Sequence, residues 1–158
     1  MNKDCKGHYF NRTVVIADIE TSSIDLPNKY FDCIVFNDIL EHVRDPWNVL
    51  KRFKSYLKED GCIIASIPNV RYYNNVKRLL LHKSWDYESS GILDYGHLRF
   101  FTKKSILSMF YECGYTVVNL EGINPVKLSW QLSLVNTILC DILCDMKYLQ
   151  FACVAKIK

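Results

Sequence analysis

Two carboxylates and an imidazole lie close together in the sequence, in a pattern that could hold a metal ion. Asp38, Glu41 and His42 follow an apolar run and occupy positions i, i+3 and i+4. If the turn after that run begins a helix, the three side chains project from one face and can converge on one ion. A mixed set of carboxylate and imidazole groups suits Mg²⁺ or Mn²⁺ moderately. The alternative is that Glu41 and His42 form hydrogen bonds that hold a later loop over the site.

Residues that could contact a ligand, most of them polar, also follow three short apolar runs of the chain. Asp18 and Ile19 follow the first run, Asn37 and Asp38 follow the second, and residues 66–69 follow the third. In an open α/β sheet, ligands bind beyond the carboxyl ends of the strands. A single carboxylate in such a place caps a turn equally well, so the set is more informative than its members.

Short apolar runs alternate with segments of helical spacing, and these are the elements that must position the polar residues. The alternation predicts an α/β domain with a mainly parallel sheet. We expect strands at residues 13–17, 31–36, 62–67, 115–120 and 149–157, with the first two in the centre of the sheet. We expect helices from Asp45-Pro46 to Asp60-Gly61, at residues 71–81, from Thr102 to Gly114 with Ile106, Leu107 and Phe110 inward, and at residues 128–142. Residues 82–101 form a long aromatic and polar insertion, of a kind that often carries function.

Composition limits the class of protein. The chain has 158 residues with 49% hydrophobic and 23% charged residues, which predicts a single folded domain over residues 1–158. A formal net charge of +3 does not indicate a nucleic-acid partner. No apolar stretch is long enough to span a membrane, and the first residues do not resemble a secretory signal, so we expect a cytoplasmic protein with its seven cysteines reduced.

Several motifs occur together in an order that is typical of one family. The chain contains FDCIVFNDILEHV, DPW, a glycine-led strand that ends in IPN, and GHLRFFT. This combination resembles the class I S-adenosylmethionine-dependent methyltransferases, particularly members that modify sugars and cell-surface polysaccharides. The resemblance covers about residues 13–122. It implies a Rossmann-like methyltransferase sheet that is mostly parallel, with an antiparallel last strand and helices on both faces.

The resemblance also implies roles for individual residues. It places Asp18 and Ile19 against the adenine of S-adenosylmethionine, with the carboxylate accepting from the exocyclic amine. Asn37 and Asp38 would lie under the methionine half of the cofactor, with Leu40 and His42 nearby. Some small-RNA 2′-O-methyltransferases and ubiquinone-pathway O-methyltransferases carry a similar acidic-x-x-Glu-His motif that binds metal. In these enzymes a later histidine completes the ligand set, which makes His97 the matching residue beside Asp38, Glu41 and His42.

The chain departs from the family pattern in its glycines. None of the six glycines forms the GxGxG turn that follows the family's first strand. The sequence is therefore similar to the C-terminal two thirds of a methyltransferase, without the first two strands and their helices. We expect weak or absent binding of S-adenosylmethionine by this chain alone. We also expect the strand at residues 31–36 to have a bare apolar edge, which either the run at residues 13–17 or another chain covers, and we favour self-association or poor solubility.

Two hypotheses about function follow. In the first, the protein methylates a hydroxyl of a small molecule or of a sugar or polysaccharide precursor, with His42 and His97 as candidate bases. In the second, the chain is a non-catalytic methyltransferase-like module that acts through self-association or partner binding. A nicotinamide-dependent oxidoreductase has little support because its glycine fingerprint is also missing.

Overall fold

The structure is a computed structural model that describes residues 14–21, 24–127, 130, 136–138 and 141–158. Its strands are β1 (Phe31–Asn37), β2 (Leu57–Pro68), β3 (Tyr115–Pro125) and β4 (Tyr148–Ile157). Its helices are α1 (Pro46–Phe53), α2 (Tyr73–Lys77) and α3 (Lys103–Glu112), with short helical turns at Lys54–Tyr56, Arg78–His82 and Cys144–Lys147. None of the helices in the described part of the chain is both long enough and apolar enough to cross a membrane.

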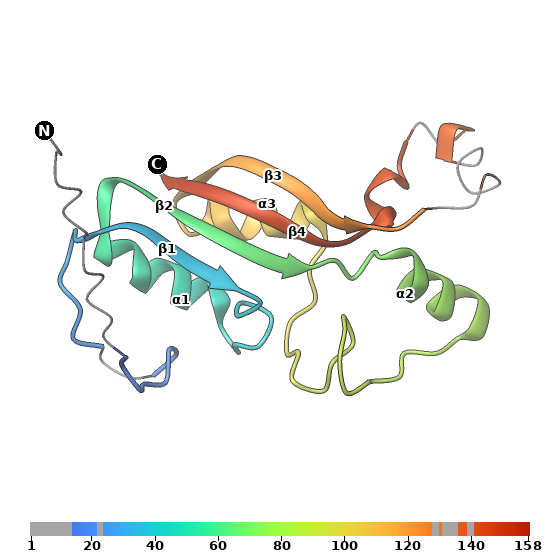
Figure 1. The fold of residues 1–158 in the computed structure, drawn as a ribbon, viewed down its shortest axis with the longest axis horizontal. Helices are drawn as coiled ribbons and strands as arrows, with labels where there is room; N and C mark the ends of the chain where they lie inside the picture. Colours follow the sequence, from blue (N-terminus) through green and yellow to red (C-terminus); the bar gives the residue numbers. More distant parts are fainter. Residues whose placement is uncertain (1–13, 22–23, 128–129, 131–135, 139–140) are drawn as a thin grey trace, which may run out of the picture.

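The four strands form one mixed sheet in the order β1-β2-β4-β3 (Figure 1). β1 pairs with β2 in parallel, whereas β4 lies antiparallel to both β2 and β3. Three strands therefore run in one direction, and β4 runs against them between β2 and β3. This arrangement confirms the expected antiparallel last strand in a sheet whose other three strands run in one direction.

The helices α1 and α3 contact each other and share one apolar core with the sheet. Asp45 caps α1 by accepting from the Asn48 N–H at 3.0 Å, and Thr102 forms a capping box with Ser105 at the start of α3. The buried Tyr115 hydroxyl donates to the Leu50 carbonyl at 2.9 Å and so joins β3 to α1. Since both helices pack on the same side, the core lies on one face of the sheet.

The opposite face of the sheet is apolar and open to solvent. Val35, Ile64 and Val118 are 51%, 38% and 55% exposed, and the register places Val35 beside Ile64. The described helices α1 and α3 pack on the other face, with the apolar core. Among the described strands, β1 pairs only with β2 and so lies at the edge of the sheet.

Some of the predicted elements differ from the structure. Residues 14–17 form no strand and Ile16 is 98% exposed, because no neighbouring strand offers them hydrogen bonds. β1 is consequently an edge strand instead of a central one. α1 ends at Phe53 and β2 begins at Leu57, earlier than expected, and Leu107 is 41% exposed instead of facing inward. Most of the helix expected at residues 128–142 lies outside the described residues.

Candidate functional site

The candidate site lies at one end of the sheet, where β1 and β2 finish and β4 begins. The register pairs Asn37 with Ser66 and Pro68 with Gln150, so these polar residues meet at the same edge. A pocket of about 200 Å³, which we call the inner pocket, opens there. It is lined by Asp38, Glu41, Pro68, Gly91, Ile92, His97, Leu149 and Gln150. The residues that line the inner pocket therefore come from the ends of strands, from the turn after β1 and from the insertion at residues 82–101.

Asp38 is held in a fixed position at the rim of this pocket. Its backbone has φ +50°, a left-handed conformation that aspartate adopts more readily than most residues. Its N–H donates to the Ser66 hydroxyl at 3.1 Å, and its Oδ1 accepts from the Ser66 hydroxyl at 3.1 Å and from Gln150 Nε2 at 2.7 Å. One carboxylate oxygen of Asp38, Oδ1, is therefore already occupied by hydrogen bonds within the protein.

Glu41 is the most unusual residue of the site. Its side chain is 1% exposed, and neither carboxylate oxygen has a hydrogen-bond partner among the described residues. Burial raises the pKa of this carboxyl from 4.5 to about 7, and the nearby Asp38 charge acts in the same direction. A buried carboxylate without a partner is costly, so this group indicates a missing ligand.

Two histidines face Glu41 and are oriented by backbone carbonyls of the insertion. His42 Nδ1 lies 3.0 Å from the Gly96 carbonyl, and His97 Nδ1 lies 2.8 Å from the Ile92 carbonyl. Because a carbonyl oxygen only accepts, each Nδ1 carries the hydrogen and each Nε2 keeps its lone pair. This is the usual second hydrogen bond of a histidine that ligates a metal through its other nitrogen.

One potential ligand atom from each of Glu41, His42 and His97 lies within 4.8 Å of the others. We call these three residues the acid–imidazole cluster. The two imidazole rings are 4.6 Å apart between centroids, at an interplanar angle of 73°. A carboxylate and two imidazoles at this separation fit a divalent cation.

The structure brings together three of the four predicted metal ligands, and Asp38 stays outside the cluster. The physical reason is the local backbone: residues 40–42 form a turn, with the His42 N–H donating to the Ile39 carbonyl at 3.0 Å, and no helix begins there. The expected i, i+3, i+4 face is therefore absent. Glu41 and His42 meet His97 because the Glu41 carbonyl accepts from the N–H groups of Leu98 and Arg99 at 2.8 and 3.0 Å.

The residues predicted to contact the cofactor are not all close together. Asp18 is exposed at a turn, where its carboxylate accepts from the Thr21 hydroxyl at 2.7 Å, and this bond lowers its pKa. The Ile19 carbonyl accepts from Arg52 at 3.0 Å, which fixes this turn against α1. Asn37 is exposed at the end of β1. Leu40 is fully buried in the core, which favours a packing role over contact with a cofactor.

Sequence reasoning missed three contributors to the site. Gln150 faces Asp38 only because β4 inserts beside β2, a long-range pairing that leaves no local signal. The carbonyls of Ile92 and Gly96 orient the histidines, and backbone groups of an aperiodic loop are invisible in residue types. The sole available hint was the concentration of glycine and aromatic residues in residues 82–101.

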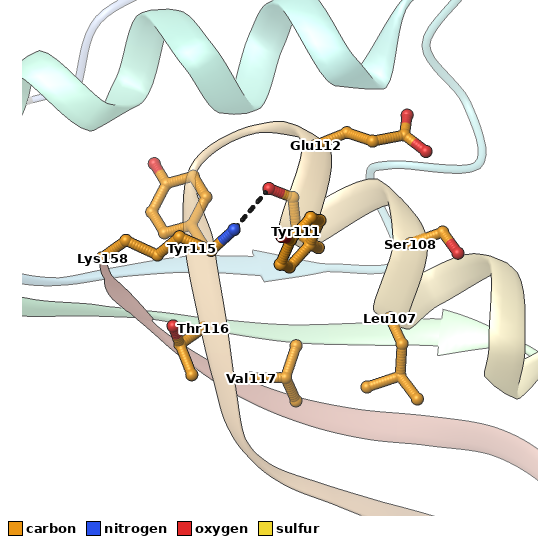
Figure 2. A pocket seen from close by; sticks show the side chains of 8 residues that line it. All are labelled: Leu107, Ser108, Tyr111, Glu112, Tyr115, Thr116, Val117 and Lys158. Carbon is orange, nitrogen blue, oxygen red and sulfur yellow. Dashed lines mark hydrogen bonds between the residues drawn. The ribbon is translucent and has the colours of Figure 1, made fainter.

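A hollow larger than the inner pocket lies elsewhere on the described surface. It measures about 460 Å³ and is bordered by α3, the start of β3 and Lys158 (Figure 2). Within it Lys158 Nζ donates to the Tyr111 carbonyl at 3.1 Å. Since β3 begins and β4 ends there, this hollow lies at the end of the sheet opposite the inner pocket. It contains no histidine and no buried carboxylate, so its size does not make it the chemical centre.

Comparisons with known proteins identify the family of the chain. The chain is 25% identical over 125 residues to a ubiquinone biosynthesis O-methyltransferase of Cereibacter sphaeroides; the match covers 77% of this chain and 49% of that protein. The chain thus spans about half the length of the curated relatives it matches.

Solved structures show the same fold. A SAM-dependent methyltransferase from Archaeoglobus fulgidus matches 96% of this chain and 69% of its own, with a TM-score of 0.63 and 17% identity. A SAM-dependent methyltransferase from Thermotoga maritima, described as a possible histamine N-methyltransferase, matches 92% of this chain and 64% of its own, with a TM-score of 0.61 and 16% identity. The family model of the methyltransferase domain matches residues 2–120, and the chain therefore belongs to the methyltransferase domain family.

Proposed function

We propose that this chain forms part of an S-adenosylmethionine-dependent O-methyltransferase that acts on a hydroxyl of a small molecule. The observation that carries the proposal is the acid–imidazole cluster beside the inner pocket, with its buried and unpartnered Glu41 carboxylate. The curated relative in ubiquinone biosynthesis is an O-methyltransferase and supports a small-molecule acceptor. A sugar or polysaccharide precursor also carries a hydroxyl group, so the proposal includes both kinds of acceptor.

Glu41, His42 and His97 are the residues that would hold a divalent cation, Mg²⁺ or Mn²⁺. When bound, the cation would lower the pKa of the acceptor hydroxyl and so favour its ionised form. The two Nδ1–H bonds to carbonyl groups keep the imidazole rings oriented with each Nε2 available. Without a cation, an Nε2 of His42 or His97 would accept the proton of the hydroxyl as a general base.

The methyl donor would lie next to the end of β1. Asp38 and Asn37 follow that strand, and Asp18 has an exposed carboxylate that can accept from an adenine amine. No glycine-rich GxG turn occurs in this sequence, so several charge-assisted hydrogen bonds to the cofactor are not supplied by these residues. At about 1.5 to 3 kcal/mol each, their loss moves a micromolar ligand to the millimolar range. We expect titration calorimetry to show weak or absent binding of S-adenosylmethionine to this chain, and micromolar binding would contradict this expectation.

The cation proposal is tested by measuring free Mn²⁺ by electron paramagnetic resonance. The wild-type chain should bind Mn²⁺, and His97→Ala and Glu41→Gln should each lose at least about tenfold in affinity, the order expected for a lost ligand. The matched control is His82→Ala, which removes an exposed histidine outside the cluster and should leave the affinity unchanged. In addition, Mn²⁺ should broaden the ring signals of His42 and His97 together. Equal Mn²⁺ affinity in the wild type and in His97→Ala would exclude the shared site.

A second candidate function is a non-catalytic module that acts through surface pairing. The unpaired edge of β1 and the open apolar face with Val35, Ile64 and Val118 favour it. Both features accept another strand or an apolar surface, and neither requires the acid–imidazole cluster. If the wild-type chain binds no Mn²⁺ and self-associates as its concentration rises, the second function is favoured over the first.

A further inference from the structure

A second hollow adjoins the inner pocket, and we call it the outer pocket. It measures about 390 Å³ and shares Gly91, Ile92 and Leu149 with the inner pocket. Its other lining residues come from α2, the turn after it and the insertion: Tyr72, Asn74, Asn75, Lys77, Arg78, His82 and Glu88. Because α2 lies beyond the end of β2 (Figure 1), the outer pocket extends away from the sheet and from the acid–imidazole cluster.

Asn75 marks a binding position in the outer pocket. Its side chain is 8% exposed, and its Nδ2 has no hydrogen-bond partner among the described residues. Its backbone carbonyl is already used, since it accepts from the Arg78 N–H at the end of α2. A buried amide donor without a partner costs about 1 to 3 kcal/mol, so this N–H group indicates an acceptor atom that a ligand supplies.

The charges around Asn75 indicate the sign of that ligand. Arg78 forms an ion pair with Glu88, which neutralises the Glu88 charge in the pocket. The Nη2 atom of Arg78 also lies 3.8 Å from Asp86 Oδ2. Lys77 has no ion-pair partner among the residues that the structure describes, and its ammonium group remains available. Among the residues that line the pocket, Lys77 and Arg78 are positive and Glu88 is negative, so the lining carries one net positive charge and several N–H donors; Asp86, beside Arg78, is not a lining residue.

We infer that the outer pocket binds an oxyanion, a carboxylate or a phosphate group, through Asn75 and Lys77. This inference rests on the proposed function in one respect: the oxyanion belongs to the methyl acceptor, whose hydroxyl lies in the inner pocket. Gly91, Ile92 and Leu149 line both pockets, so the two lie next to each other, and an elongated molecule that passes over these residues would reach both. The substrate class is therefore a hydroxylated small molecule with an acidic group at a distance from the reacting hydroxyl.

The test uses nuclear magnetic resonance and two probes, inorganic phosphate and benzoate. Each is titrated into the wild-type chain in the presence of a chelator and without methyl donor, and the side-chain amide signal of Asn75 is followed. We expect a saturable shift with at least one probe. Saturation by phosphate alone assigns a phosphate group, saturation by benzoate alone assigns a carboxylate, and saturation by both supports a general oxyanion site.

Two variants and one matched control complete the test. Asn75→Leu should weaken binding of the probe by at least about tenfold, because one hydrogen bond to a charged group is lost. For this variant the backbone amide signals of α2 report the binding. Lys77→Gln changes an exposed residue, so it tests the pocket even if Asn75→Leu does not fold. Lys83→Gln removes an exposed lysine that does not line the pocket and should bind as the wild type does.

The result that overturns the inference is the absence of saturation with both probes, or equal affinities in the wild type, Asn75→Leu and Lys77→Gln. The two proposals fail separately, because this titration involves neither a cation nor a methyl donor. A chain that binds an oxyanion but no Mn²⁺ would contradict the cation site and leave the outer pocket intact.

Discussion

Replacing Glu41 by glutamine should stabilise the cation-free protein at neutral and alkaline pH, although Glu41 is a candidate ligand. The Glu41 side chain is 1% exposed and its two carboxylate oxygens have no hydrogen-bond partner among the described residues. Burial raises the pKa of this carboxyl from 4.5 to about 7, because the ionised form loses its hydration. Glutamine has nearly the same shape and carries no charge, so it removes the cost of ionisation.

The size of the effect follows from the two pKa values. In the unfolded chain the carboxyl ionises near pH 4.5, whereas in the folded protein it stays protonated up to about pH 7. The contribution of Glu41 to the free energy of unfolding of the wild type therefore falls as the pH rises between these values and is level above them. The full difference corresponds to about 3 kcal/mol, of which about 2 kcal/mol lies between about pH 5.5 and about pH 8.

The assay is urea denaturation of both proteins with a chelator present, at about pH 5.5 and about pH 8. The advantage of Glu41→Gln over the wild type should grow by about 2 kcal/mol between these conditions. Glu59→Gln is the control: Glu59 is exposed and its pKa is lowered by the hydrogen bond from Lys29, so its change should be small and of opposite sign. An equal pH dependence of the wild type and Glu41→Gln would refute the reasoning.

Mn²⁺ should reverse this order of stabilities. A cation that binds only the folded wild type, at about one thousand times its dissociation constant, adds about 4 kcal/mol to the free energy of unfolding, which exceeds the advantage of Glu41→Gln. Glu41→Gln lacks the charged ligand and should gain much less. If Mn²⁺ stabilises both proteins equally, Glu41 is not a ligand.

Three further substitutions test the fold that supports the site. Thr102→Ala should lower the free energy of unfolding by about 1 kcal/mol in urea denaturation, because it removes the capping box with Ser105; an unchanged midpoint would contradict this. Tyr115→Phe should cost about 1 to 2 kcal/mol by the same measurement, through loss of the hydrogen bond to the Leu50 carbonyl, and a neutral effect would show that bond to be dispensable. In sedimentation velocity at high concentration, the wild type should self-associate through the edge of β1, and Val35→Lys should remain monomeric; a monomeric wild type would exclude pairing through this edge.

The local parts of the fold could be predicted from the sequence, and the long-range parts only partly. Asp45-Pro46 marked the start of α1 and Gly114, with φ +81°, followed the end of α3, because capping depends on neighbouring residues. The strand expected at residues 13–17 does not form over residues 14–17, and the reason is not local. A β-branched run becomes a strand only beside a partner, and its own residues do not reveal whether the partner is present.

The candidate site was predictable in its residues and not in its geometry. The prediction grouped Asp38 with Glu41 and His42 on one helical face, but a turn forms there instead of a helix. Hydrogen bonds with Gln150 and Ser66 keep Asp38 away from the other two residues. Helical spacing is a sound argument only where a helix forms. The pairing of His42 with His97 depends instead on loop backbone, which residue types do not specify.

The two alternatives for Glu41 and His42, metal ligation and support of the insertion, are compatible in this structure because they use different atoms. The Glu41 carbonyl and His42 Nδ1 hold the insertion, through Leu98, Arg99 and Gly96. A Cβ at Gly96 would lie 3.1 Å from His42 Nδ1, so the absence of a side chain lets the loop backbone reach the ring. The Glu41 carboxylate and both Nε2 atoms take no part in this support. The same hydrogen bonds that position the insertion therefore orient the free ligand atoms, and fixing the loop also organises the cluster before any cation binds.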